Sequence, residues 1–494
     1  MIYATSSESL SATNRPRTII MADPELDDLN SMIRLLLYSN EIRIEGLIYA
    51  SSRFHWKGDG KGTTFLLPDR EYDEPQTSFR WAEGECFIHD AVDAYAEVYA
   101  NLIVHDPGYP HPDDLRAVIR DGNIEFEGDM SQDSPGSRLI ADALLDDEPG
   151  LVHLQNWAGT STMARALRSI EERHSGTPEW QDVRARVSRK AVVTKFSSQD
   201  STYDDYIRPN WPELRVTDVA CFAWGYPVRR VVLPKDEYML SAAWMRENVT
   251  SVGPLGALYR VWGDGRQMVE GDYTDFFHLS GHSTEELQEM GYRVWIEPQP
   301  AGEWISEGDT PNMLNLLGNG LRGHEHPSFG GWGGRGTRLE EGPDTWALRP
   351  TVDTAADGGT PGEYSLTRWF GDAQRDFATR LRWSVTREYA GANHHPEVAV
   401  SPGLDVSGEP GSAMTLSASA TDPDDDSLSY HWWQYAEAGT YAGRVALYGN
   451  DGSEVTLTVP SDGAAGQTIH LILEVEDDAA MPLKRYQRVI VTIE

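Results

Sequence analysis

Three carboxylates, those of Asp23, Asp27 and Asp28, lie within one short segment that reads Asp-Pro-Glu-Leu-Asp-Asp. Carboxylates this close repel one another and lose solvation when they are buried. A hard cation or a polyhydroxyl ligand would relieve both penalties, so the spacing favours a binding site of that kind. The alternative is structural, because Asp27 and Asp28 can begin a helix whose dipole stabilises them.

The elements that must position these acids are a strand before them and a helix after them. Residues 18–21 form a short apolar, partly β-branched run, which predicts a strand. Apolar residues then recur at helical spacing, at Met32, Ile33, Leu36 and Leu37. The acids therefore occupy the carboxyl end of a strand, which is the edge where open α/β sheets bind ligands.

Strand and helix patterns go on alternating through the first 390 residues. Further strands are predicted at 44–49, 151–154 and 191–196, and helices at 91–101, at 138–145 and from about Met163 onward. Residues 57–81 are rich in Gly, Asp and Pro, which is typical of a surface loop. The alternation predicts an α/β fold for this part of the chain.

The carboxyl end has a different pattern. Residues 390–396 have the composition of a linker with few crossing contacts, so we expect the residues before this linker to fold without those after it. Beyond it, short alternating runs predict an all-β sandwich of immunoglobulin-like or cadherin-like type, at 414–418, 429–435, 455–459, 469–475 and 488–493. Trp432 and Trp433 point to opposite faces of their strand, so at most one of them belongs to the sandwich core. The predicted division is a disordered segment 1–16, an α/β domain 17–390 and a sandwich 393–494.

Composition limits the partners. The 494 residues carry a formal charge of −36, which repels phosphate backbones and anionic lipid, so neither nucleic acid nor membrane partners are expected. No apolar run is long enough to span a bilayer. Two cysteines, Cys86 and Cys221, cannot form a disulfide framework. A homo-oligomer is compatible with these observations.

The segment Asp23-Pro-x-x-Asp27-Asp28 resembles the Asp-Thr-Asp-Pro-Gly-x-Asp-Asp signature of nucleoside hydrolases. More of the chain resembles a related family of nucleoside hydrolase-like, cellulose-binding proteins, through segments at 44–48, 93–95, 253–256, 307–311, 319–321 and 331–335. The resemblance implies an open, mostly parallel sheet with helices on both faces, followed by an immunoglobulin-like sandwich. Members of this family are often exported. Residues 1–17 lack the apolar core of a signal peptide, so a soluble chain is expected and its compartment is not predicted.

The resemblance also implies roles for the acids. Asp23, Asp28, Asp309 and the backbone carbonyl of Trp157 would hold a calcium ion, and Asp27 would bind sugar hydroxyls. Asp23 would also act as the general base. From the residues alone, Asp309 can equally be a helix N-cap, and only spacing separates it from Glu307, the second candidate for its role.

The remaining candidates for substrate binding come from the other predicted loops. They are Ser52 and His55 after the second strand, Asp133, Asn248, His324 and His326. Of these, Asp133, His324 or His326 could protonate a leaving group. Each has a structural alternative, such as helix capping or plain solvation for Asp133.

The predicted function is hydrolysis of a glycosidic bond in an N-ribosyl-like or furanosyl carbohydrate, with a calcium-bound water activated by Asp23. Two departures from the signature weaken this prediction, because Met21 replaces its first Asp and Glu25 replaces its Gly. The alternative is a non-catalytic protein that binds a cellulose-like polysaccharide on the same fold. A purely structural module is a third hypothesis.

Overall fold

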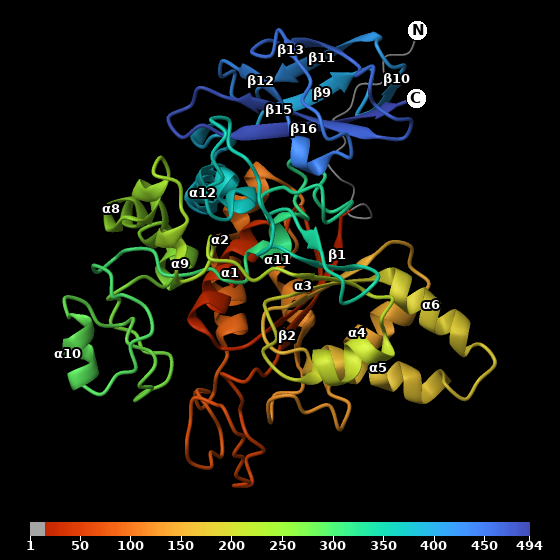
Figure 1. Cartoon of the computed structure of the whole chain (residues 1–494). Helices are drawn as coiled ribbons and strands as arrows, with labels where there is room; N and C mark the ends of the chain where they lie inside the picture. Colours follow the sequence, from red (N-terminus) through yellow and green to blue (C-terminus); the bar gives the residue numbers. More distant parts are fainter. Residues whose placement is uncertain (1–14) are drawn as a thin grey trace.

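The computed structural model describes residues 15–494, so the predicted disordered segment 1–16 lies outside the described residues except for its last two. An eight-stranded sheet forms the centre of the larger part of the molecule (Figure 1). Its strand order is β3-β2-β1-β4-β5-β6-β8-β7, and every neighbouring pair is parallel except β7 and β8. The strands are β1 Arg17–Ala22, β2 Arg43–Tyr49, β3 Ile119–Asp121, β4 Val152–Asn156, β5 Ala191–Lys195, β6 Arg215–Asp218, β7 Thr337–Arg338 and β8 Thr345–Ala347. The predicted α/β class is confirmed.

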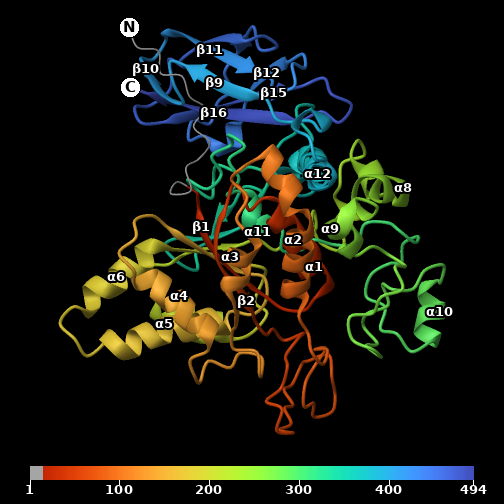
Figure 2. The same ribbon diagram turned by 180° about the vertical axis from the view of Figure 1, so that it is seen from behind.

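Helices cover both faces of the sheet. The side chains of β1 are apolar on both sides, so each face must be buried against a layer of helices. Ile20 and Ala22 belong to one buried cluster with the long helices α1, α2 and α12, whereas Ile19 and Met21 belong to another with α4 and α5. Figure 2 shows these two helix layers on opposite sides of the strands. The helices are α1 Leu26–Leu37, α2 Phe87–His105, α4 Pro135–Leu145, α5 Ser161–His174, α6 Trp180–Lys190 and α12 Tyr364–Val385.

Shorter elements fill the long connections. They are α3 Pro112–Ala117, α7 Arg208–Asn210, α8 Ala242–Met245, α9 Gly253–Leu258, α10 Thr284–Glu289, α11 Pro311–Leu314, and six single-turn 3₁₀ or π segments at 203–207, 228–230, 237–240, 246–250, 389–391 and 436–438. The predicted loop 57–81 is indeed irregular, but it has a small apolar cluster of its own around Trp56, Tyr72 and Phe79. None of the described helices is long and apolar enough to span a membrane.

Two four-stranded sheets form the carboxyl-terminal part and enclose one apolar core, as predicted for a sandwich. One sheet has the order β10-β16-β15-β12 and the other β13-β14-β11-β9. Trp432 is 1% exposed in this core, whereas Trp433 points out of it. The strands are β9 Glu397–Ser401, β10 Asp405–Gly408, β11 Ala413–Thr421, β12 Ser429–Gln434, β13 Leu447–Tyr448, β14 Glu454–Thr458, β15 Thr468–Glu476 and β16 Lys484–Ile493.

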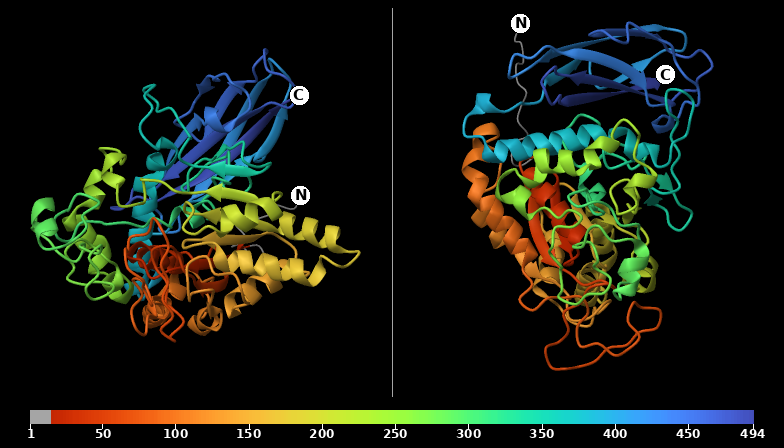
Figure 3. Two further views of the ribbon diagram at one scale, coloured as in Figure 1. Left: turned by 60° about the horizontal axis from the view of Figure 1, so that its bottom comes forward. Right: turned by 90° about the vertical axis from the view of Figure 1, so that its left-hand side faces the viewer.

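The prediction that few contacts cross between the two parts is wrong. The sandwich lies directly over α12 (Figure 3), and Tyr435, Ile472 and Tyr486 share a buried apolar cluster with the α/β part. The side chain of Arg488 is fully buried and donates hydrogen bonds to the carbonyl oxygens of Leu321 (2.6 Å) and Gly330 (2.8 Å). Composition revealed the linker, but it could not reveal contacts made by residues far from it in the sequence.

Backbone pairing at residues 319–320 continues this interface. The Tyr486 amide donates to the Asn319 carbonyl (2.9 Å) and the Arg488 amide donates to the Gly320 carbonyl (3.0 Å). A Cβ at Gly320, whose φ is +92°, would lie 1.8 Å from the Tyr486 carbonyl oxygen. The Asn-Gly-Leu segment that carries part of the family resemblance therefore serves the contact with the sandwich.

Candidate functional site

A cavity of about 530 Å³ opens at the carboxyl end of the parallel sheet. Its wall comes from the turn after β1, the segments after β5 and β6, and Gly308 and Asp309 just before α11. After β1 the chain goes outward to β2 and β3 and then returns to β4 on the other side of β1. Open α/β sheets bind ligands at such a reversal of strand order. The acidic turn is therefore placed where the fold itself leaves a crevice.

The acids of this turn do more than begin α1. Glu25 occupies the N-cap position, but its side chain makes no capping hydrogen bond. Asp28 Oδ1 accepts a hydrogen bond from the Asp23 amide (3.1 Å). Asp27 Oδ2 accepts from the Ser306 hydroxyl (2.7 Å) and the Gly308 amide (3.2 Å). These bonds hold the turn against the segment before α11, which carries Asp309.

Asp23 is the least satisfied member of the group. Its side chain is 1% exposed, and neither carboxylate oxygen has a hydrogen-bond partner among the described residues. His55 Nδ1 lies 3.3 Å from Asp23 Oδ1, and both ring nitrogens of His55 also lack a hydrogen bond there. Asp309 Oδ1 is a further buried oxygen without a partner. Buried polar atoms are normally paired, so this concentration of unpaired ones marks a place where a ligand, an ion or ordered water would supply the missing partners.

Burial raises the pKa values of Asp28, Asp309 and Glu25 well above the usual carboxyl range, and mutual repulsion raises them further. Burial also raises the pKa of Asp27, and the hydrogen bond from Ser306 opposes that shift. Without a counter-ion, some of these carboxyl groups therefore keep their protons at pH values where an exposed acid is ionised. A cation in the cavity would have to displace those protons.

These shifts predict how stability depends on pH. A carboxyl group whose pKa is higher in the folded than in the unfolded state favours folding at low pH, and this contribution is lost as pH rises toward the folded value. In the presence of a chelator, the melting temperature should therefore fall between pH 5 and pH 8 as part of this contribution disappears. The decline should be shallower in Asp309→Asn than in wild type, and unchanged in Glu285→Gln, which alters an exposed acid. An identical slope in Asp309→Asn would contradict the prediction.

The donor atoms fit a divalent cation. One donor atom from each of Asp23, Glu25 and His55 lies within 4.8 Å of the others, and the same holds for Glu25, Asp27 and Asp28. Together with the unpaired oxygen of Asp309 this is an oxygen-rich set of the kind that calcium prefers, with one imidazole beside it. Glu25 stands where the nucleoside hydrolase signature has Gly, and it belongs to both sets. The fourth predicted ligand, the Trp157 carbonyl, accepts a hydrogen bond from Gln199 Nε2 (2.5 Å), which leaves it one lone pair.

Several wall residues were not predicted as site residues. Tyr226 donates to Glu25 Oε1 (3.2 Å), and the ring of Trp295 meets it edge to face, with 4.7 Å between ring centroids. Further aromatic and cationic groups in the wall are Phe54, Phe196, Phe222, Arg53, Arg80 and Arg349. Arg80 comes from the loop 57–81, and an ion pair with Asp272 (2.7 Å) holds it. Three of them had a signal in the sequence, because Phe196 ends a predicted strand and Arg53 and Phe54 lie between the predicted residues Ser52 and His55.

Four predicted substrate-binding residues lie outside this cavity. Asp133 binds Arg165 (2.7 Å), and Asn248 donates to the Trp244 carbonyl (3.1 Å) within its own helical turn. His324 lines a small separate cavity of about 60 Å³, and the ring of His326 packs against Trp346. Ser52 and His55 are closer to the prediction. The Ser52 hydroxyl accepts from the amides of Phe54 (3.0 Å) and His55 (3.2 Å), which shapes the turn that brings His55 to Asp23.

Glu307 has a structural partner instead of a ligand. It is fully buried and receives hydrogen bonds from Arg34 Nε (2.5 Å) and Nη2 (2.8 Å), as well as from Tyr259 (2.5 Å) and Thr310 (2.8 Å). Arg34 belongs to α1, so this pair fixes the helix that follows the acidic turn. The prediction that Glu307 could stand in for Asp309 does not match this geometry.

Glu307→Gln should lower the free energy of unfolding by about 3–5 kcal/mol, because it leaves the guanidinium of Arg34 buried without its counter-charge. Urea denaturation measures this loss. Glu303→Gln is the matched control, since Glu303 pairs with Arg229 where both side chains are more than a fifth exposed, and it should cost about 1 kcal/mol or less. Equal losses in the two variants would show that the burial of the Arg34 pair does not matter.

Comparison with known proteins agrees with this fold. Residues 17–335 match the family model described as cellulose-binding Sde182, nucleoside hydrolase-like domain, and residues 413–493 match that of cellulose-binding protein Sde0182, C-terminal domain. Among solved structures, the chain is similar to a nucleoside hydrolase-related hypothetical protein from Saccharophagus degradans that is associated with carbohydrate metabolism. The TM-score is 0.70 and the identity 24%, over 97% of this chain and 100% of that one. No curated protein matches. The chain therefore belongs to the nucleoside hydrolase-like, cellulose-binding Sde182 family.

Proposed function

We propose that this protein binds carbohydrate in the acidic cavity, together with a divalent cation such as calcium. One observation carries the proposal: Asp309 Oδ1, in the wall of a cavity with aromatic side chains, and both carboxylate oxygens of the buried Asp23 have no hydrogen-bond partner among the described residues. The family's description as cellulose-binding supports carbohydrate as the ligand class. Asp23, Asp28 and Asp309 would hold the cation, with Glu25 and His55 close enough to contribute.

The other wall residues suit a polyhydroxyl ligand. Asp27 is fixed by Ser306 and Gly308 as an acceptor, and a carboxylate held in this way binds a sugar hydroxyl without losing side-chain entropy. The rings of Tyr226 and Trp295 offer apolar faces to the C–H faces of a sugar. A pocket with a few fixed polar groups between aromatic walls is typical of a small-molecule site.

Cation binding should appear as a gain in stability. With the cation at about 100 times its dissociation constant, the free energy of unfolding should increase by about 2.7 kcal/mol, and a chelator should remove this gain. Calorimetric melting with calcium and with chelator measures it. Asp28→Asn and Asp309→Asn should each reduce the difference, whereas Asp147→Asn, at a fully exposed side chain, should preserve it. Identical melting curves for the wild type in calcium and in chelator would contradict the proposed cation site.

Carbohydrate binding is tested by retention of the full chain on insoluble cellulose, with and without chelator. The proposal expects retention that falls when the cation is removed. Retention that Asp27→Asn and Asp309→Asn leave unchanged would place the binding outside the acidic cavity and overturn the proposal.

Hydrolysis of a glycosidic bond is the second candidate function, and the buried pair Asp23 and His55 favours it. A divalent cation bound there would lower the pKa of a neighbouring water. Asp23 Oδ1 or Oδ2 would accept the proton of that water while the water oxygen attacks the anomeric carbon. The bond to the leaving group breaks and the electron pair departs with that group. An N-ribosyl or furanosyl substrate suits this chemistry. Release of free nucleobase or reducing sugar from a panel of nucleosides and oligosaccharides tests it.

A further inference from the structure

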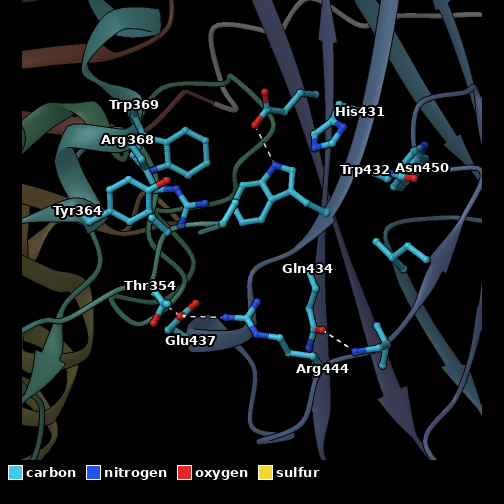
Figure 4. Close-up of a pocket in the computed structure, with 16 residues that line it drawn as sticks. Thr354, Tyr364, Arg368, Trp369, His431, Trp432, Gln434, Glu437, Arg444 and Asn450 are labelled. Atoms are coloured by element: carbon cyan, nitrogen blue, oxygen red, sulfur yellow. Dashed lines mark hydrogen bonds and ion pairs between the residues drawn. The ribbon is translucent and has the colours of Figure 1, made fainter. Parts of the chain in front are cut away.

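A second large cavity, of about 490 Å³, lies between the sandwich and α12. It shares no lining residue with the acidic cavity. Figure 4 shows Tyr364, Arg368 and Trp369 on the α12 side, facing His431, Gln434 and Asn450 from the sandwich. Because both parts of the molecule contribute to its wall, this interdomain cleft exists only when the two are packed together.

Arg368 is the unusual group in the cleft. Its side chain is 13% exposed, and its guanidinium lies over the rings of Trp433 (4.2 Å to the centroid), Tyr364 (4.8 Å) and Trp369 (5.2 Å). The nearest carboxylate, Asp353, is 3.9 Å away. No described residue accepts a hydrogen bond from this guanidinium. Its five N–H donors therefore have no protein acceptor, and the guanidinium lies among aromatic rings in the wall of the cleft.

The carboxylates near Arg368 are already used by other groups. Asp353 is fully buried and accepts from Arg335 (2.7 Å) and from the Tyr435 hydroxyl (2.5 Å). Glu474 accepts from Trp433 Nε1 (2.8 Å) and Lys484 Nζ (2.8 Å).

On the rim, Glu437 accepts from the Thr354 amide (3.2 Å), and its carboxylate lies 3.8 Å from Arg444. Among the described residues that line the cleft, Arg368 and Arg444 therefore have no hydrogen-bonded counter-ion, and of these two only Arg368 is largely buried. Both lie in a protein whose overall charge is strongly negative.

We propose that this cleft binds a short acidic oligosaccharide, with the carboxylate of a uronic acid residue on Arg368 and an adjoining sugar ring against Trp433. A guanidinium binds a carboxylate through two parallel hydrogen bonds, which suits a cation with free donors. Aromatic faces are electron-rich and match the C–H face of a pyranose. The volume is in the range of small-ligand sites. At physiological ionic strength the Debye length is about 8 Å, so the distant surface charge does not cancel this local attraction.

Titration calorimetry on the full chain tests the proposal, in chelator and about 0.15 M salt. The probes are a tetramer of β-1,4-linked mannuronate and a tetramer of β-1,4-linked glucose. The uronate should bind, and the neutral tetramer should bind at least about tenfold more weakly. Arg368→Gln should weaken uronate binding by about 10- to 100-fold, because it removes a charge-assisted pair. Arg186→Gln, on the distant helix α6, is the matched control and should have no effect.

A second variant guards against misfolding of Arg368→Gln. Asn450→Asp adds a negative charge to the wall of the cleft at nearly unchanged side-chain volume, and it should also weaken uronate binding. Asp309→Asn should leave uronate binding unchanged, which separates this cleft from the acidic cavity. Equal affinity for the two tetramers, no binding of the uronate, or binding that survives both Arg368→Gln and Asn450→Asp would each overturn the proposal.

Discussion

A chain that ends at residue 390 should not accumulate as a folded, soluble protein. Removal of the sandwich would expose one side of a buried cluster that contains Trp332 and Trp369. It would also remove the guanidinium of Arg488, which donates hydrogen bonds to the carbonyls of Leu321 and Gly330. The backbone hydrogen bond to the Gly320 carbonyl would be lost as well. Apolar surface of this kind drives aggregation when its partner is absent.

Expression of residues 15–390, followed by size-exclusion chromatography and circular dichroism, measures the effect of this truncation. Co-expression of residues 391–494 as a separate chain is the control, and it should recover soluble material if the interface alone is missing. A truncated protein that remains monomeric and melts cooperatively at the wild-type temperature would contradict the prediction. In that case the two parts would be independent despite their contacts.

If the hydrolysis proposed as the second candidate function operates, Asp23→Asn should lower its rate by about 10²- to 10⁴-fold, the usual contribution of a general base. An amide oxygen can still approach a cation, but it cannot accept the proton of the attacking water. Retention on carbohydrate should therefore change much less than turnover. Single-turnover product release and cellulose retention, measured on the same preparation, separate the two effects.

Asp133→Asn is the control for this experiment, because Asp133 lies outside the cavity and pairs with Arg165. It should preserve both turnover and retention. Full activity in Asp23→Asn would exclude Asp23 as the base and overturn the mechanism proposed for hydrolysis.

The local part of the site could be predicted from the sequence. The strand before Asp23 and the helix after Asp28 follow from short-range periodicity, and the structure places both elements there as β1 and α1. The alternation of strands and helices followed by a sandwich was equally accessible, because its pattern repeats over many residues. The mostly parallel sheet was an implication of the family resemblance.

The rest of the cavity depends on residues that are distant in sequence. Arg80 reaches the wall from a loop that looked like simple surface, and Tyr226 donates to Glu25 across 201 positions. Glu307 was a reasonable candidate ligand by spacing alone, and only the packing of α1 showed that Arg34 neutralises it. Sequence periodicity shows which residues are buried, but it does not show which buried groups meet.

The sequence by itself determined the alternation of strands and helices up to about residue 196, the acidic turn after the first strand, the family and the presence of a β-sandwich. Only the tertiary structure decided which acids share a cavity. It also decided that backbone amides of the sandwich donate hydrogen bonds to the carbonyls of residues 319 and 320, and that Arg368 lies without a hydrogen-bonded partner in a cleft between the two parts. The physical reason is that local propensity and periodicity act over a few residues. The pairing of buried charges and carbonyls is fixed only when distant segments pack together.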